Sequence, residues 1–207
     1  MAEKKVVLEF VDKATECVMH DVVVEGEALS DLERLAGEEG GFEFGGMEFI
    51  LDDDRVLDIV RRFTSGNLSG VGAISIRPCN PFDKLPYKTH TNRELALMLS
   101  GAKPFAVFFD DAPNRRELEL VPERLFDPHV DSGKFVKKEV FEFLHGHQVR
   151  TVFYALKDEA WRIDAWRLLM KTARKSGWSE GFERMQGSLL GYEDWQNDAH
   201  IALMYPK

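Results

Sequence analysis

Two neighbouring aspartates, Asp110 and Asp111, directly follow the most apolar segment of the chain, residues 104–109. Carboxylates at the end of a buried strand can hold Mg²⁺ or act as a general base. Asp52–Asp54 also follow an expected strand, and if both strand ends met, the carboxylates could build a divalent-metal site for phosphoryl chemistry. The simpler interpretation, which we favour, is that these aspartates turn the chain and cap helices. Asp110 and Asp111 are therefore candidate catalytic residues only if the protein is an enzyme.

A second group of residues could bind an anion. Lys84, Lys88, His90 and Arg93 form the densest cationic stretch of the chain and lie just before an expected helix. A helix N-terminus carries a partial positive charge and free N–H groups, and arginine can grip a carboxylate or phosphate with two hydrogen bonds. Glu94 opposes the anion unless Arg93 pairs with it. The alternative is a solvated loop that leads into an ordinary helix.

Three histidines could take part in a metal site. His145 and His147 have the H-x-H spacing that directs both rings to one side of a strand, and His129, Asp131 and Glu142 are near them in sequence. A zinc site needs at least three ligands, and two surface histidines in a loop are the commoner arrangement. We therefore expect no metal here.

Several common catalytic signatures are absent from the sequence. The chain contains no G-x-G-x-x-G, no Walker A loop, no G-x-S-x-G elbow and no H-E-x-x-H. The usual nucleotide-binding and hydrolase routes thus have no sequence support, and we expect no cofactor.

The four tryptophans all fall in the last third of the chain, at Trp161, Trp166, Trp178 and Trp195. Trp161 and Trp166 are five residues apart, so they do not share one face of a helix. Packing between three terminal helices is the use that we favour for them, because tryptophan contributes much area to cores. The alternative is a groove for a partner, since Trp and Arg are enriched at binding hot spots.

A glycine inside an expected helix, Gly187, needs a reason, because an interior glycine destabilises a helix by about 1 kcal/mol relative to alanine. A close helix crossing or a ligand that touches the backbone would supply that reason.

The charge balance limits the classes of partner. The chain has 27 basic and 36 acidic residues, a formal net charge of −9. We expect no general affinity for nucleic acid, whose binding depends on phosphate neutralisation, and none for an anionic membrane surface. The surplus of acid favours solubility, and the alternative is docking on a basic partner.

Cysteine usage and the start of the chain indicate a cytoplasmic protein. Cys17 and Cys79 are far apart and belong to no C-x-x-C pair, so we expect free thiols in a reducing compartment. No apolar stretch typical of a signal peptide follows the charged first residues, and no run approaches the roughly 20 residues of a membrane helix.

The pattern of elements predicts an α+β fold with a mixed or mostly antiparallel sheet. The expected strands are 5–11, 17–25, 71–76, 104–109 and 149–154, with a Gly-Gly hairpin at 42–51. The expected helices are 28–36, 56–63, 94–99, 159–175, 179–190 and 193–203, with Thr91 or Asn92 as a cap and Ser179 as another. The unbroken apolar run at 105–109 predicts a central strand buried on both faces. We expect one domain over residues 1–207, with a helical C-terminal subregion of about residues 157–204.

These features lead to two hypotheses of different class. The first is a non-catalytic cytosolic protein that binds another macromolecule, as an adaptor, inhibitor or regulatory subunit, and another protein is the partner that we favour. The second is an enzyme on a phosphorylated or other anionic small substrate, with His90 and Arg93 holding the anion and Asp110 or Asp111 as a metal ligand or general base.

Overall fold

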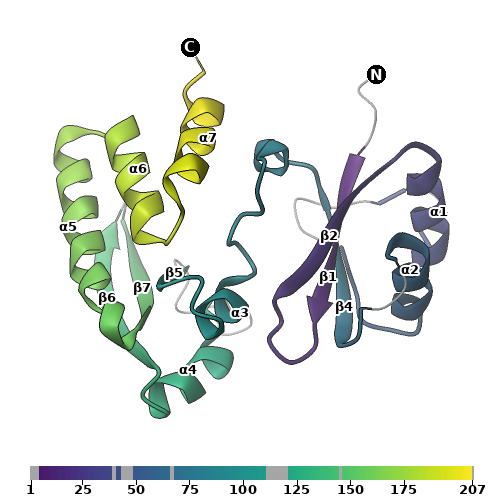
Figure 1. Cartoon of the computed structure of the whole chain (residues 1–207), viewed down its shortest axis with the longest axis horizontal. Coiled ribbons are helices and arrows are strands. Elements are labelled where there is room, and N and C mark those ends of the chain that lie inside the picture. Colours follow the sequence, from purple (N-terminus) through teal and green to yellow (C-terminus); the bar gives the residue numbers. More distant parts are fainter. Residues whose placement is uncertain are drawn as a thin grey trace. The chain divides into compact units, whose positions relative to one another are not determined.

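The computed structural model describes residues 5–38, 41–42, 49–65, 68–110, 121–144 and 146–206. It confirms the α+β class, with seven α-helices and two antiparallel sheets in the described residues (Figure 1). Contacts between Cα atoms divide the chain into two compact units. Unit 1 comprises residues 1–84 and 88–93, and unit 2 comprises residues 85–87 and 94–207.

Unit 1 is a four-stranded antiparallel sheet in the order β2-β1-β4-β3, with two helices against one face (Figure 1). Its elements are β1 (Lys5–Asp12), β2 (Val18–Glu25), α1 (Gly26–Ala36), β3 (Phe49–Leu51), α2 (Arg55–Phe63), β4 (Val71–Pro78) and the 3-10 helix η1 (Pro81–Lys84). The part of the predicted hairpin at residues 43–48 lies outside the described residues. The strand that follows it, β3, pairs with β4.

The core of unit 1 follows from period-two alternation along β1. Val6, Leu8 and Phe10 point to the helix-covered face and are fully buried against leucines of α1 and the valines and isoleucine of α2. Val7 and Glu9, on the other face of the strand, are buried as well. A central strand buried on both sides therefore does exist in this protein, and it is β1.

Unit 2 contains a three-stranded antiparallel sheet in the order β5-β7-β6. Its elements are α3 (Glu94–Leu99), β5 (Phe105–Asp110), α4 (Glu123–Asp131), β6 (Phe135–Leu144), β7 (His147–Leu156), the 3-10 helix η2 (Lys157–Glu159), α5 (Trp161–Ser176), α6 (Glu180–Leu189) and α7 (Asp194–Met204). On one face of this sheet Phe105 and Phe153 pack against Trp166 of α5. On the other face Tyr154 lies 4.6 Å, ring to ring, from Phe126 of α4.

The expectation of a central strand at residues 105–109 is wrong. Within the described sheet β5 is an edge strand and β7 is central. Phe105 and Ala106 are buried, but the side chain of Phe109 is 55% exposed. An apolar run indicates that a strand has apolar neighbours, but it does not distinguish an edge strand from a central one, because strand order is a tertiary property.

The expected helix cap before α3 is also wrong. Asn92 has a φ of 59°, so it lies in the left-handed region and not in the extended conformation of an N-cap. The helix begins at Glu94 and has only six residues.

The three C-terminal helices are confirmed. Ser179 caps α6 by accepting a hydrogen bond from the N–H of Phe182, as its position predicts. A capping box between Glu193 and Gln196 begins α7. Gly187 of α6 faces Asn197 of α7 so closely that a Cβ there would overlap with the Asn197 amide. The interior glycine therefore serves a close helix crossing.

No helix in the described part of the chain is long and apolar enough to cross a bilayer.

Candidate functional site

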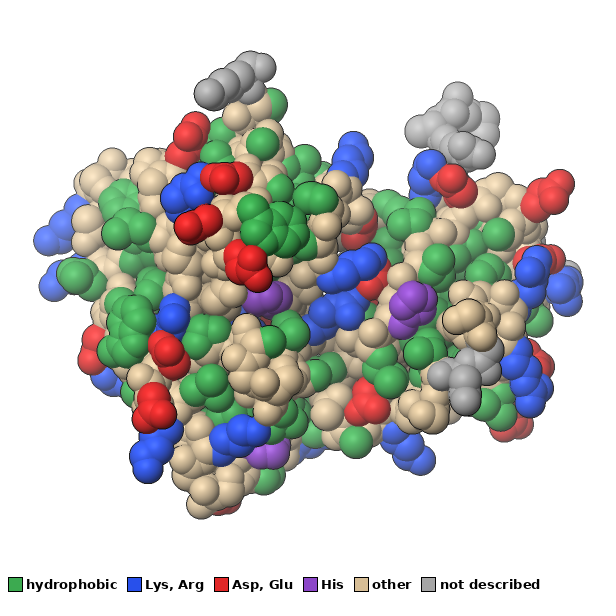
Figure 2. All heavy atoms as spheres, viewed as in Figure 1, with side chains coloured by type: hydrophobic (Ala, Val, Ile, Leu, Met, Phe, Trp, Pro, Cys, Tyr) green, Lys and Arg blue, Asp and Glu red, His purple; other side chains and the backbone are tan. Residues whose placement is uncertain are grey.

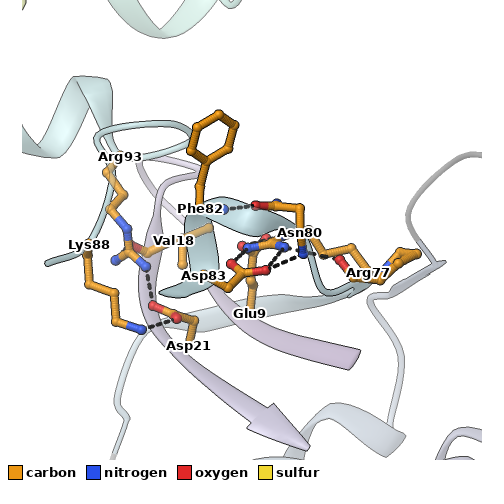
Figure 3. A network of polar contacts seen from close by, with 10 residues as sticks. Glu9, Val18, Asp21, Arg77, Asn80, Phe82, Asp83, Lys88 and Arg93 are labelled. Carbon is orange, nitrogen blue, oxygen red and sulfur yellow. Dashed lines mark hydrogen bonds and ion pairs between the residues drawn. The ribbon is translucent and has the colours of Figure 1, made fainter. Parts of the chain in front are cut away.

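Two of the four predicted anion-binding residues, Lys88 and Arg93, belong to a network of ion pairs in unit 1 (Figure 3). Lys88 and Arg93 both pair with the carboxylate of Asp21 on β2, and Arg93 also donates a hydrogen bond of 2.8 Å to the carbonyl of Val18. The side chain of Asp21 is almost buried. These contacts tie the segment at 88–93 to the edge of the sheet, so an external anion would have to compete with Asp21 for the two cations.

A second set of ion pairs lies on the same sheet (Figure 3). Arg77 of β4 contacts Glu9 at 2.9 Å and Asp83 of η1 at 2.8 and 3.0 Å. The carboxylate of Asp83 raises the pKa of the Arg77 guanidinium, and Glu9 adds to this effect. Glu9 and Asp21 are opposite each other in the register of β1 and β2. Arginine and lysine thus offset carboxylates throughout the network, which suits a structural role.

The other two predicted anion ligands lie nearby in sequence. Lys84 is exposed at the end of η1, and His90 is half-buried. All four predicted cations belong to unit 1, whereas Asp110 belongs to unit 2.

The structure describes only part of the predicted carboxylate site. Asp110 ends β5 and stands opposite Arg150 in the register of β5 and β7. Asp111 lies outside the described residues. Asp53 accepts hydrogen bonds of about 3 Å from the backbone and side chain of Arg55 at the start of α2. Asp53 therefore turns the chain into a helix, which is the role that we favoured for the aspartates.

Near Asp110 a cluster that the sequence analysis missed joins α4 to the sheet. Glu123 binds Lys137 at 2.5 Å and Arg150 at 2.7 and 2.9 Å. Asp127 binds Lys137 at 3.0 Å and accepts a hydrogen bond of 2.7 Å from the hydroxyl of Tyr154. Arg150, followed by Lys137, lowers the pKa of Glu123 to about 2. A carboxylate this strongly paired is a poor general base, so the cluster holds α4 rather than offering a reactive group.

The side chains of the predicted histidine pair fall outside the part of the chain that the structure describes. His145 and the side chain of His147 lie outside the described residues, and His129 packs 5.3 Å from the ring of Phe135. Among the residues that are described, no group of three His, Cys, Asp or Glu side chains could hold a metal ion.

The tryptophans divide differently from the core packing that we favoured. Trp166 is buried, but Trp161, Trp178 and Trp195 are exposed by 43–56%. For the two tryptophans of α5, the reason is that this helix presents two apolar faces. Ile163 and Trp166 face the sheet, whereas Trp161 faces away from it.

This second face of α5 borders an apolar groove against α6, which we call the α5–α6 groove. Its volume is about 770 Å³, and its apolar lining includes Trp161, Ala165, Leu168, Leu169, Phe182 and Met185. Positions 161, 165, 168 and 172 have the spacing of one helical stripe, so the sequence carried a signal for this face. The stripe resembles core packing in the sequence, and only the fold shows that no described element covers it.

Three large side chains of the groove are unusually exposed. Trp161 is 56% exposed, Met185 57% and Leu168 66%. In the space-filling view, hydrophobic side chains over the C-terminal helices lie among acidic and basic ones (Figure 2). Contiguous apolar side chains with a polar surround are typical of a protein-interaction site.

Two arginines supply the charge in the lining of the groove. Arg162 donates to Glu159 at 2.7 Å and to the carbonyls of Ser188 and Leu189 at 2.9 and 3.1 Å, which holds the end of α6 to α5. Its guanidinium lies 4.8 Å from the centroid of the Trp161 ring. Arg184 pairs with Asp198 of α7 at 2.5 Å. The groove walls are therefore braced by hydrogen bonds before any partner arrives.

Comparisons with family models, curated proteins and solved structures find no match to this chain.

Proposed function

We propose that this protein is a non-catalytic adaptor, inhibitor or regulatory subunit that binds another protein through the α5–α6 groove. The observation that carries the proposal is the exposure of Trp161, Leu168 and Met185 around one apolar groove. Exposed apolar area of this kind is unfavourable in water and becomes favourable when a partner covers it.

The chemistry of the groove indicates an amphipathic helix as the partner segment. A groove between two helices accepts the apolar stripe of a third, read at i, i+3, i+4 and i+7. The charged residues in the lining are Arg162 and Arg184, both basic, and the carboxylates that pair with them, Glu159 and Asp198, are not part of the lining. We therefore expect acidic residues beside the apolar stripe of the partner helix, since complementary charges favour encounter and register.

Helical peptides test this proposal directly. Two amphipathic peptides share the same apolar stripe, which is flanked by acidic residues in one and by basic residues in the other. Both carry a fluorescent label, and anisotropy measures their binding. We expect the acidic version to bind more tightly. Met185→Glu should weaken its binding roughly thirtyfold, about 2 kcal/mol, as for a hot-spot residue.

The matched control is Leu57→Glu, which places the same charge at another exposed apolar residue, on α2 of unit 1. It should leave binding unchanged. Equal binding of the two peptides, or equal effects of the two variants, would contradict the proposal. Sedimentation that shows a dimer abolished by Met185→Glu would instead assign the groove to a second copy of the chain.

The enzyme hypothesis, with an anion at Lys84, Lys88, His90 and Arg93, keeps its own test. Calorimetric titration of phosphate and carboxylates into the wild type and Arg93→Ala should show binding that the substitution removes. Binding that survives the substitution would place the anion elsewhere.

A further inference from the structure

A second groove of unit 2 lies between the sheet and the C-terminal half of α5. Its volume is about 590 Å³, within the range of small-molecule sites. Its apolar lining comes from all three strands and the helix: Phe109 of β5, Val140 of β6, Phe153 of β7, and Trp166 and Met170 of α5. We call it the basic groove, because of the side chains at its edge.

Four cations line the basic groove along one helix. Arg167, Lys171 and Lys175 follow one another at intervals of four residues, and Arg174 lies three residues after Lys171, so all four share one side of α5. Among the described lining residues the acid is Glu142, which Arg174 binds at 2.8 Å. The groove thus carries a surplus of positive charge in a chain whose net charge is −9.

The helix dipole accounts for only part of this arrangement. Arg174 and Lys175 lie in the last turn of α5, where a cation is favourable. Arg167 and Lys171 lie further from the end, and the series 167, 171, 175 places like charges at successive i, i+4 positions, which repel. Lys171 and Lys175 form no ion pair with the described residues. A bound anion would relieve this repulsion.

We propose that the basic groove binds a small organic anion with an apolar body and a carboxylate or phosphate head. The body lies on Phe109, Val140 and Met170, which are the more accessible apolar residues of the lining, and the head meets Lys171 and Lys175. This site goes beyond the proposed function, because it takes a small ligand on a different side of α5 from the α5–α6 groove, although Leu168 lines both.

Calorimetry with defined probes tests the site. 2-Naphthoate, 2-naphthyl phosphate and decanoate below its micelle concentration present aromatic or aliphatic bodies with two anionic heads. Neutral 2-naphthamide tests the head, and acetate and inorganic phosphate test the need for a body. We expect the amphiphilic anions to bind, the amide to bind roughly tenfold more weakly, and the head groups alone to give no measurable heat.

Charge reversal locates the site. Lys171→Glu with Lys175→Glu should weaken naphthoate binding at least roughly tenfold, and the corresponding double change to Gln should give a smaller loss. Lys157→Glu is the matched control, since this exposed lysine precedes the opposite end of the same helix. It should leave binding unchanged, as should Met185→Glu in the α5–α6 groove.

Four results would overturn the proposal. The first three are no binding of any amphiphilic anion at millimolar concentration, equal affinity for naphthoate and naphthamide, and equal losses in the Lys171/Lys175 and Lys157 variants. The fourth is loss of naphthoate binding in Met185→Glu alone, which would move the ligand to the α5–α6 groove. Retained naphthoate binding alongside failed peptide binding would refute the proposed function and leave this site standing.

Discussion

Lys103 is a buried lysine in unit 2, only 2% exposed. Its Nζ donates to the carbonyl of Leu190 at 3.3 Å and lies 5.9 Å from the centroid of the Tyr192 ring. Burial lowers the pKa of Lys103 from its ordinary 10.5 to about 8, against an opposing effect of Glu94. The hydrogen bond of Lys103 therefore links the segment before β5 to the end of α6. Burial of the charged ammonium lowers the free energy of unfolding, because the charge loses its hydration.

This burial predicts a pH dependence of stability. Between about pH 8 and 10.5 the unfolded chain still holds the proton that folded Lys103 has released, so the free energy of unfolding rises with pH. Below pH 8 both states are protonated and the cost is present in full. Relative to Lys103→Met, the wild type should gain on the order of 3 kcal/mol across this window, measured by urea unfolding at several pH values. The same comparison with exposed Lys157→Met should show no such gain.

At the scale of elements, the crossing of α6 and α7 depends on one missing side chain. Gly187 lets α7 approach, and Asn197, which is buried there, donates to the hydroxyl of Ser188 at 3.3 Å and to the carbonyl of Tyr192 at 3.4 Å. These contacts keep α6 in place, and α6 forms one wall of the α5–α6 groove.

Gly187→Ala should therefore destabilise the protein by about 1–3 kcal/mol, because overpacking at the crossing outweighs the better helix propensity of alanine. Thermal unfolding measures the change. The matched control is Gly181→Ala in the same helix, where a Cβ would meet Ser179 at an ordinary 3.7 Å. That variant should be as stable as the wild type or slightly more so. If Gly187→Ala is also stabilising, the close crossing is not a constraint.

The edge position of β5 changes the effect that we expect a charged substitution in this strand to have on stability. Val107 is half-buried and packs at the border of the cluster around Phe105 and Trp166. On a central strand Val107→Asp would unfold the protein. At an edge the carboxylate can reach water, so we expect a folded protein with a lower unfolding temperature, by circular dichroism. A chain that fails to fold would indicate that the strand is covered on both faces.

At the scale of the whole molecule, the sequence predicts one domain, whereas the contacts form two compact units. If the chain is one domain, it should unfold in a single cooperative transition, and that is the result we expect. All four tryptophans lie in unit 2, so their fluorescence reports that unit, while far-ultraviolet circular dichroism reports helices of both. The two melting curves should coincide. Separate midpoints would show that the units unfold as two domains.

The same melts test the independence of the fold from metal and disulfides. Cys17 and Cys79 are free thiols, one buried and one exposed. Chelator and reductant should each leave the transition unchanged, because the apolar cores of the two units supply the stability. A loss of cooperativity with either reagent would contradict this.

The sequence by itself determined the local elements of this protein. The end of α1 at Ala36, the cap of α6 at Ser179 and the strand character of β1 all depend on neighbours within a few residues, and the structure agrees with each. The apolar stripe of α5 that contains Leu168 was also readable, because its period is local.

Only the tertiary structure decided what those elements meet. Asp21 is 67 and 72 residues away from Lys88 and Arg93, so no pattern could show that it pairs with both. The edge position of β5, the exposure of the Trp161 face and the basic groove likewise depend on which elements pack together and which do not. Local periodicity indicates that a face of a helix or strand is apolar or charged, but the tertiary structure alone determines whether another element covers that face.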